Sequence, residues 1–159
     1  MGSSAGTRRS VRFAGRDFPE KRHVCAFFYS KEEEWESLLP YVREGLEAGD
    51  KAFHIVDPAL RPAHLERMRS AGVDVDEKLR SGQLDVRVWE EAYLRGGVFD
   101  QNAMLRLIEE VLGAGAGGRL TRLIANMEWA LLNRPGVNDL VEYETRLNYI
   151  LPKFDDPVI

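Results

Sequence analysis

An apolar run that leads directly into a helix start decides the fold: His23-Val24-Cys25-Ala26-Phe27-Phe28-Tyr29-Ser30, followed by Lys31-Glu32-Glu33-Glu34-Trp35. A continuous apolar run that becomes aromatic towards its end predicts a strand, over residues 24–29, buried on both faces of a parallel sheet. Ser30 is a favoured N-cap residue, and Glu33 three residues later predicts a capping box. The sequence therefore predicts a central strand that turns sharply into a helix.

The rest of the chain alternates between strand and helix patterns. Further strands are predicted at residues 51–57, 84–89 and 120–127, and the main helices at residues 31–48, 62–71, 101–112 and 140–151. This alternation predicts an α/β three-layer sandwich, in which helices cover both faces of a mainly parallel sheet. Ligands of such sheets bind beyond the carboxyl ends of the strands. Four segments fall there: Tyr29 with Ser30, Asp57, residues 89–93, and Glu128 with Trp129.

Length and composition restrict the class of protein. The chain has 159 residues, a formal net charge of -4 and a single cysteine, Cys25. The length suits one domain, the charge gives no basic footprint for nucleic acid, and the lone cysteine suits a reducing cytoplasm. No apolar run is long enough to span a membrane. We therefore expect a cytoplasmic protein with no direct nucleic-acid partner and no membrane partner.

The charged N-terminus differs in character from the rest. Residues 1–21 are rich in arginine and polar residues and lack an apolar pattern, so we expect a disordered charged tail there. A DNA-contacting arm is the alternative interpretation. Residues 22–159 are expected to form a single α/β domain.

A nucleotide-binding loop is missing at the first strand-to-helix junction. A P-loop needs glycines after the strand and Lys-Ser/Thr at the helix start. Here Glu32, Glu33 and Glu34 occupy the first turn, where they complement the helix dipole and would repel a triphosphate. The glycine-rich run at residues 113–118, a predicted flexible link, follows a helix and precedes a strand, which is the wrong order for a phosphate cradle.

His23 and Cys25 stand two residues apart on the predicted first strand, so their side chains would point to the same face. Two ligands do not make a metal site, and His54 and His64 are the only other histidines. A packed cysteine is the default interpretation, with a metal or redox role as the alternative. We expect neither a metal ion nor a cofactor.

Two carboxylates are candidates for a ligand site. Glu128 and Trp129 end the fourth predicted strand, where desolvation could raise the pKa of the carboxyl group. A glutamate that pairs with a helix arginine over a core tryptophan is the equally weighted alternative. On the last helix, Glu144 shares a stripe with apolar residues, with Tyr143 beside it and Asn148 one turn later. A buried carboxylate of this kind either ties elements together or holds a polar ligand.

Several motifs, taken together, resemble a known family. They are His23-Val24-Cys25, Phe28-Tyr29-Ser30, Gly45-Leu46 with Gly49-Asp50, Met127-Glu128-Trp129-Ala130, and Tyr143-Glu144 with Leu147-Asn148. Their order and combination resemble the MEDS domain, a sensory domain named for methanogens and methylotrophs, over roughly residues 22–159. The resemblance implies a degenerate relative of RecA- and KaiC-like ATPases without the nucleotide chemistry.

The same resemblance implies a sensory role in bacterial or archaeal signalling, beside a kinase, an anti-sigma-type ATPase module or a DNA-binding domain. It implies small organic ligands such as simple hydrocarbon derivatives. It also implies that the family continues past Ile159 with the rest of a strand, so that we expect this chain to be either truncated at its C-terminus or an unusually short member. The matching motifs give these candidate ligand-binding residues: His23, Cys25, Tyr29, Glu128, Trp129, Tyr143, Glu144 and Asn148.

Three functional hypotheses follow. The first is a non-catalytic sensory domain that binds a small organic ligand at the strand ends and signals to a partner protein or output domain, with a homodimer among the expected assemblies. Trp129, Tyr29 and Trp89 would form apolar walls, and Glu128, Glu144 and Asn148 would orient the ligand. The second is a degenerate ATPase-like interaction module without a small-molecule ligand. The third is a hydrolase that depends on Cys25 or on a carboxylate.

Overall fold

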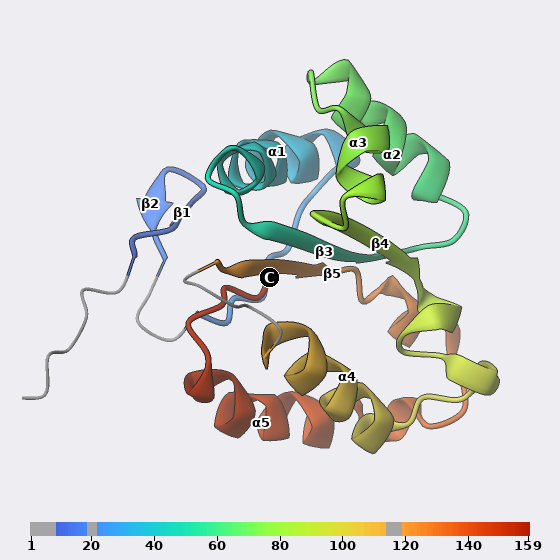
Figure 1. Ribbon diagram of the computed structural model, residues 1–159. Coiled ribbons are helices and arrows are strands. Elements are labelled where there is room, and N and C mark those ends of the chain that lie inside the picture. The colour runs from blue at the N-terminus through green and yellow to red at the C-terminus, as the bar shows by residue number, and fades with distance from the viewer. Residues whose placement is uncertain (1–8, 19–21, 114–118) are drawn as a thin grey trace, which may run out of the picture.

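A three-stranded parallel sheet lies at the centre of the computed structural model, which describes residues 9–18, 22–113 and 119–159 (Figure 1). The strands are β3 (Lys51–Val56), β4 (Leu84–Val88) and β5 (Thr121–Ala125), in the order β4-β3-β5. Both pairs are parallel, with His54 opposite Val86 on one side and Ile124 on the other. The predicted α/β class and parallel sheet are confirmed.

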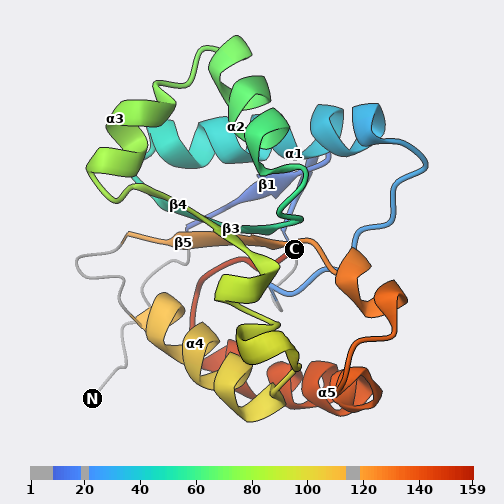
Figure 2. The same ribbon diagram turned by 90° about the vertical axis from the view of Figure 1, so that its right-hand side faces the viewer.

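Helices cover both faces of this sheet (Figures 1 and 2). One face carries α1 (Lys31–Glu47), α2 (Arg61–Ser70) and α3 (Val75–Arg80). The other carries α4 (Gln101–Gly113) and α5 (Leu140–Ile150). The specific relation to RecA- and KaiC-like ATPases stays a prediction. Among the described residues, no helix is both long enough and apolar enough to cross a bilayer.

The start of α1 forms as the sequence predicts. The backbone NH of Glu33 donates to Ser30 Oγ at 3.1 Å, and the Glu33 carboxylate accepts from the backbone NH of Tyr29 at 2.6 Å. These reciprocal hydrogen bonds satisfy free NH groups of the first turn. Pro40 lies inside α1 without ending it.

The predicted central strand is wrong. Of residues 24–29, none belongs to a strand, and the preceding His23 makes only an isolated parallel bridge with Val158. Val158 in turn bridges Leu123 of β5, so the C-terminal residues 157–159 lie between β5 and the first segment. The segment consequently sits outermost, and along residues 24–29 the even-numbered side chains are half-buried while the odd-numbered ones are exposed.

The described part of the N-terminal tail is also more ordered than predicted. Residues 9–18 form a hairpin whose strands are β1 (Arg12–Phe13) and β2 (Arg16–Asp17). Phe13 and Phe18 pack against the ring of Tyr41 on α1, and Val11 is buried. Apolar contacts therefore hold this stretch against the domain, in place of the expected disordered arm. Residues 1–8, 19–21 and 114–118, covered by the predictions of a tail and a flexible link, lie outside the described residues.

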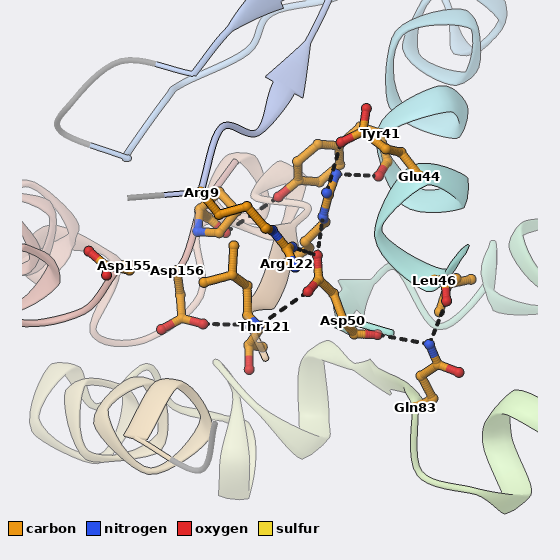
Figure 3. Close-up of polar contacts among 12 residues, drawn as sticks. Arg9, Tyr41, Glu44, Leu46, Asp50, Gln83, Thr121, Arg122, Asp155 and Asp156 are labelled. Carbon is orange, nitrogen blue, oxygen red and sulfur yellow. Dashed lines mark hydrogen bonds and ion pairs between the residues drawn. The ribbon is translucent and has the colours of Figure 1, made fainter. Parts of the chain in front are cut away.

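A buried ion-pair network ties the amino ends of the strands together (Figure 3). Arg122 of β5 donates from Nε to Asp50 at 2.9 Å, from Nη1 to the backbone oxygen of Tyr41 at 2.8 Å and from Nη2 to Glu44 at 2.9 Å. Asp50 also pairs with Arg9 and accepts from the backbone NH of Leu120. Because Asp50 precedes β3, the network lies at the edge of the sheet opposite the carboxyl ends of the strands.

Candidate functional site

A cavity of about 800 Å³ opens at the carboxyl ends of β3 and β5. Its lining includes the segment at residues 23–31, the ends of these two strands, and the C-terminal Val158 and Ile159. Side chains from both helical layers reach it, Trp35 and His64 from one layer and Tyr143 and Leu147 from the other. Its size and position fit the small-molecule sites of open α/β sheets, which usually hold about 300–1,000 Å³.

One wall of the cavity carries phenol and carboxyl groups from α5 and the loop after β4. Tyr143 and Tyr93 meet edge to face, with ring centroids 6.2 Å apart, and both line the cavity. Burial raises the pKa of both phenols above the ordinary value, and the charge of Glu144 adds to the shift. Both phenols therefore remain protonated at neutral pH.

Glu144 links this wall to the outermost segment. Its carboxylate lies 3.6 Å from Nε2 of His23, whose Nδ1 lies 3.3 Å from Oδ1 of Asn148. Burial raises the pKa of Glu144, and the nearby His23 opposes the shift. The structure thus brings together three residues that the sequence singled out separately. Asn148 itself is exposed and outside the cavity lining, so its contribution is to hold His23.

Trp129 supports the wall from behind and does not line the cavity. It is fully buried, with its ring centroid 5.1 Å from that of Tyr93 and 4.9 Å from that of Phe99. Trp129 therefore lies behind the cavity wall and does not form its surface, in contrast to the predicted role. Trp89 is also absent from the lining, since it is buried and donates to the backbone oxygen of Asn126.

The opposite wall comes from α1 and α2. Trp35 packs against His64 with ring centroids 4.9 Å apart, and Arg67 lies over the Trp35 ring at 5.7 Å. His64 Nε2 lies 2.9 Å from Nδ1 of His54, which is buried on β3. Burial, together with the charge of Arg61, lowers the pKa of His64 to about 4. Both imidazoles are consequently neutral at pH 7.

The mouth of the cavity carries an ion-pair cluster. Lys31 Nζ lies 3.0 Å from the carboxylates of both Glu34 and Glu128. Burial lowers the pKa of Lys31, but the hydrogen bonds that it donates to Glu128 and Glu34 outweigh this effect and raise it. Glu128 therefore pairs with a helix lysine, and this contact joins the start of α1 to the chain after β5. The carboxylates in the first turn of α1 pair with neighbouring groups of the protein. This agrees with the absence of a phosphate-binding loop at this junction.

The remaining candidates lie on the exposed side of the outermost segment. Tyr29 and Cys25 belong to the lining, but the side chain of Tyr29 is fully exposed and Cys25 is exposed as well. Phe27 and Leu131, which the sequence analysis did not select, are 92% and 86% exposed beside them. The rim of the cavity is therefore unusually apolar for a surface.

Sequence reasoning missed Tyr93 and His64 as cavity residues. Tyr93 lies in the loop that was placed at the strand ends, so its position was the available signal. His64 sits on a helix with a weak apolar pattern, and only its pairing with His54 reveals its burial. Among the described residues, no three His, Cys, Asp or Glu side chains gather in a way that could hold a metal ion.

Comparison with known proteins gives two matches. The profile of the MEDS family, described as the methanogen/methylotroph, DcmR sensory domain, matches residues 22–157. The transcriptional repressor DcmR of Methylorubrum extorquens is 28% identical over 143 residues, which cover 89% of this chain and 51% of the repressor. The chain thus spans about half the length of this curated relative. No solved structure matches the chain.

Proposed function

The chain belongs to the MEDS family of sensory domains, and we propose that it binds a small organic molecule in the cavity at the strand ends and passes this event to a partner protein or output domain. The observation that carries the proposal is the cavity of about 800 Å³. It lies where α/β sheets bind ligands, and it combines apolar walls with a few buried polar groups.

The proposed binding residues follow from the lining. Tyr143, Glu144 and His23 supply polar groups on one wall, and His64 supplies a neutral imidazole on the other. Glu128 and Lys31 close the mouth through their ion pair. Ligand binding and signal transmission require no chemical reaction, so the proposed function is non-catalytic. A cytoplasmic location belongs to the same proposal.

The output is proposed by analogy with the relative, which is a transcriptional repressor. A ligand in the cavity touches residues 23–31, and the same segment exposes Phe27 and Tyr29. Ordering of this segment by the ligand would change the apolar rim that a partner, or a second copy of the chain, contacts. The partner would bind the ligand-free and the ligand-bound arrangement of this segment with different affinities, and this difference would transmit the signal.

A cavity-filling substitution tests the proposal. Ala125 lies at the end of β5 in the lining, and Ala125→Trp places an indole in the cavity. We expect at least one member of a panel of small organic compounds to raise the melting temperature of the wild type but not of Ala125→Trp. Ala48→Trp, at the exposed end of α1, is the matched control and should respond like the wild type. Equal responses of the wild type, Ala125→Trp and Ala48→Trp would show that the compounds bind outside the cavity. If none of the three proteins responded, the sensory proposal would be contradicted.

The interaction module without a ligand is the second candidate, because Phe27, Tyr29 and Leu131 are exposed by 86% or more. Light scattering over a concentration series separates the two candidates. A tight oligomer whose stability no compound alters favours the module. The thiol version of the hydrolase hypothesis gains no support, since the Cys25 thiol makes no hydrogen bond to a base among the described residues.

A further inference from the structure

Tyr143 brings to the cavity a buried hydroxyl group that makes no hydrogen bond of normal distance and angle among the described residues, although the phenol of Tyr93 lies close enough to influence its pKa. Three buried side-chain polar atoms share this property among the described residues: His54 Nε2, Trp129 Nε1 and the Tyr143 hydroxyl. Of these three residues, only Tyr143 lines the cavity. An unpaired buried polar group is costly, so a ligand that pairs with this hydroxyl is favoured over one that does not.

The protonation state of Tyr143 decides what the ligand must offer. Burial, with the neighbouring Tyr93 and Glu144, raises the pKa of the phenol well above its usual value. A neutral phenol has one proton to donate. The ligand must therefore present an oxygen or nitrogen lone pair at this point of the wall.

The charges around the cavity disfavour an anionic ligand. Lys31 and Arg67 are the lysine and arginine side chains in the described lining, and both are already paired with carboxylates, Lys31 with Glu34 and Glu128 and Arg67 with Glu32. Glu144 follows Tyr143 directly and adds negative charge to the same wall. An anion would leave water without gaining a free cation there.

A cationic ligand fits the hydroxyl no better. An ammonium group has no lone pair, so it cannot accept the proton of Tyr143. A cation would also share the carboxylate of Glu144 with His23, which lies 3.6 Å away. Apolar surroundings remain on this wall, where Ile108, Leu147 and the ring of Tyr93 are buried.

We propose that the cavity binds an uncharged organic molecule whose carbonyl or ether oxygen accepts a hydrogen bond from Tyr143 and whose apolar part packs against Ile108 and Leu147. This inference rests on the proposed sensory function, because it names the chemical class of the ligand. It also makes Tyr143 a residue that selects among ligands of similar shape.

Four probes of similar size test the proposal by calorimetry or ligand-observed NMR. Acetophenone carries the carbonyl oxygen, α-methylstyrene replaces that oxygen by a methylene group, and benzoate and benzylamine carry opposite charges. We expect acetophenone to bind about tenfold more tightly than α-methylstyrene, as one added hydrogen bond to a buried donor allows. Both charged probes should bind more weakly than acetophenone.

The variant Tyr143→Phe removes the hydroxyl and keeps the ring. Its dissociation constant for acetophenone should rise about tenfold, to that of α-methylstyrene, whose own affinity stays the same. Tyr149→Phe changes an exposed tyrosine of the same helix and should behave like the wild type. Without ligand, Tyr143→Phe should melt at or above the wild-type temperature, because it removes an unpaired buried group.

Several results would overturn this inference. They are equal affinity of acetophenone and α-methylstyrene, unchanged affinity in Tyr143→Phe, preference for a charged probe, binding of none of the four, or a lower melting temperature of ligand-free Tyr143→Phe. The sensory function is judged separately. A compound that stabilises the wild type but not Ala125→Trp sustains that function even when the role of Tyr143 fails.

Discussion

Gly45 owes its importance to the side chain that it lacks. A methyl group at this position of α1 would lie 2.5 Å from Nε of Arg122, and it would also contact Cδ. Arg122 is 2% exposed and holds Asp50, Glu44 and the backbone of Tyr41 at once. Gly45 and Asp50 belong to a motif that marks the family by resemblance. The structure gives that motif a physical cause, since one residue makes room for the buried arginine and the other neutralises it.

Gly45→Ala should therefore destabilise the protein. Alanine favours a helix over glycine by about 1 kcal/mol. Displacement of Arg122 from a buried ion pair costs more, about 3–5 kcal/mol when the pair is broken outright. We expect a net loss of about 2–4 kcal/mol in the free energy of unfolding, measured by urea denaturation.

The arginine provides the control for this prediction. In an Arg122→Ala background the clash is absent, so Gly45→Ala should become neutral or stabilising by up to about 1 kcal/mol. The same loss in both backgrounds would show that contact with Arg122 is not the reason for the glycine.

At the scale of elements, the strands and helices of the two layers were largely predictable, but the order of pairing was not. Residues 24–28 have the apolar composition of a buried strand, yet residues 157–159 pair with β5 in their place. The apolar composition of a segment indicates that it packs against the core. It does not indicate with which strand of the sheet the segment pairs. The candidate site shows the same limit. Glu144 was found from helical spacing and Tyr143 from its place beside it and from the family resemblance. The burial of Trp129, in contrast, depends on Tyr93 and Phe99, which lie far away in sequence.

The histidine pair that joins β3 to α2 predicts a pH dependence of stability. Burial, with the charge of His64, lowers the pKa of His54 well below 6.5, and the pKa of His64 falls from 6.5 to about 4. The unfolded chain therefore binds more protons than the folded chain between these values. This stability is fully present above pH 6.5 and is lost as the pH falls towards 4. The shift of His64 alone corresponds to about 3 kcal/mol.

Other buried groups act in the opposite sense, so a difference between variants is the useful measurement. Burial raises the pKa of Asp156 to about 6 and also raises that of Glu144, so both favour the folded state at low pH. Between pH 7 and 4, His54→Leu/His64→Leu should lose less stability than the wild type, by about 3 kcal/mol or more. Tyr149→Phe changes an exposed side chain outside the pair and should keep the wild-type dependence. If the free energies of unfolding of the wild type and the double variant changed equally with pH, the proposal that both histidines are neutral in the folded protein would be refuted.

At the scale of the whole molecule, the cavity connects parts that are distant in the chain. Its lining takes residues from both helical layers, from the ends of β3 and β5 and from the outermost segment. Within the described residues, the amides of residues 25–28 donate no backbone hydrogen bond, while Val24 NH donates to Val158 at 3.0 Å. A segment with few hydrogen bonds opens at little cost in free energy. A segment with few hydrogen bonds thus lines the cavity and carries Phe27 and Tyr29 of its apolar rim.

Hydrogen exchange should therefore report ligand binding at this segment. In the free protein, amides of residues 25–28 should exchange quickly, while those of β3, hydrogen-bonded on both sides, remain protected. Saturation with the compound that best stabilises the wild type should slow exchange at residues 25–30 by about tenfold or more. In Ala125→Trp the same concentration should leave it unchanged. If the ligand protected only α4 and α5, binding would be confined to one layer, and the rim at Phe27 and Tyr29 could not carry the signal. Slower exchange at residues 25–30 without a change in β3 would tie occupancy of the cavity to the surface that a partner contacts.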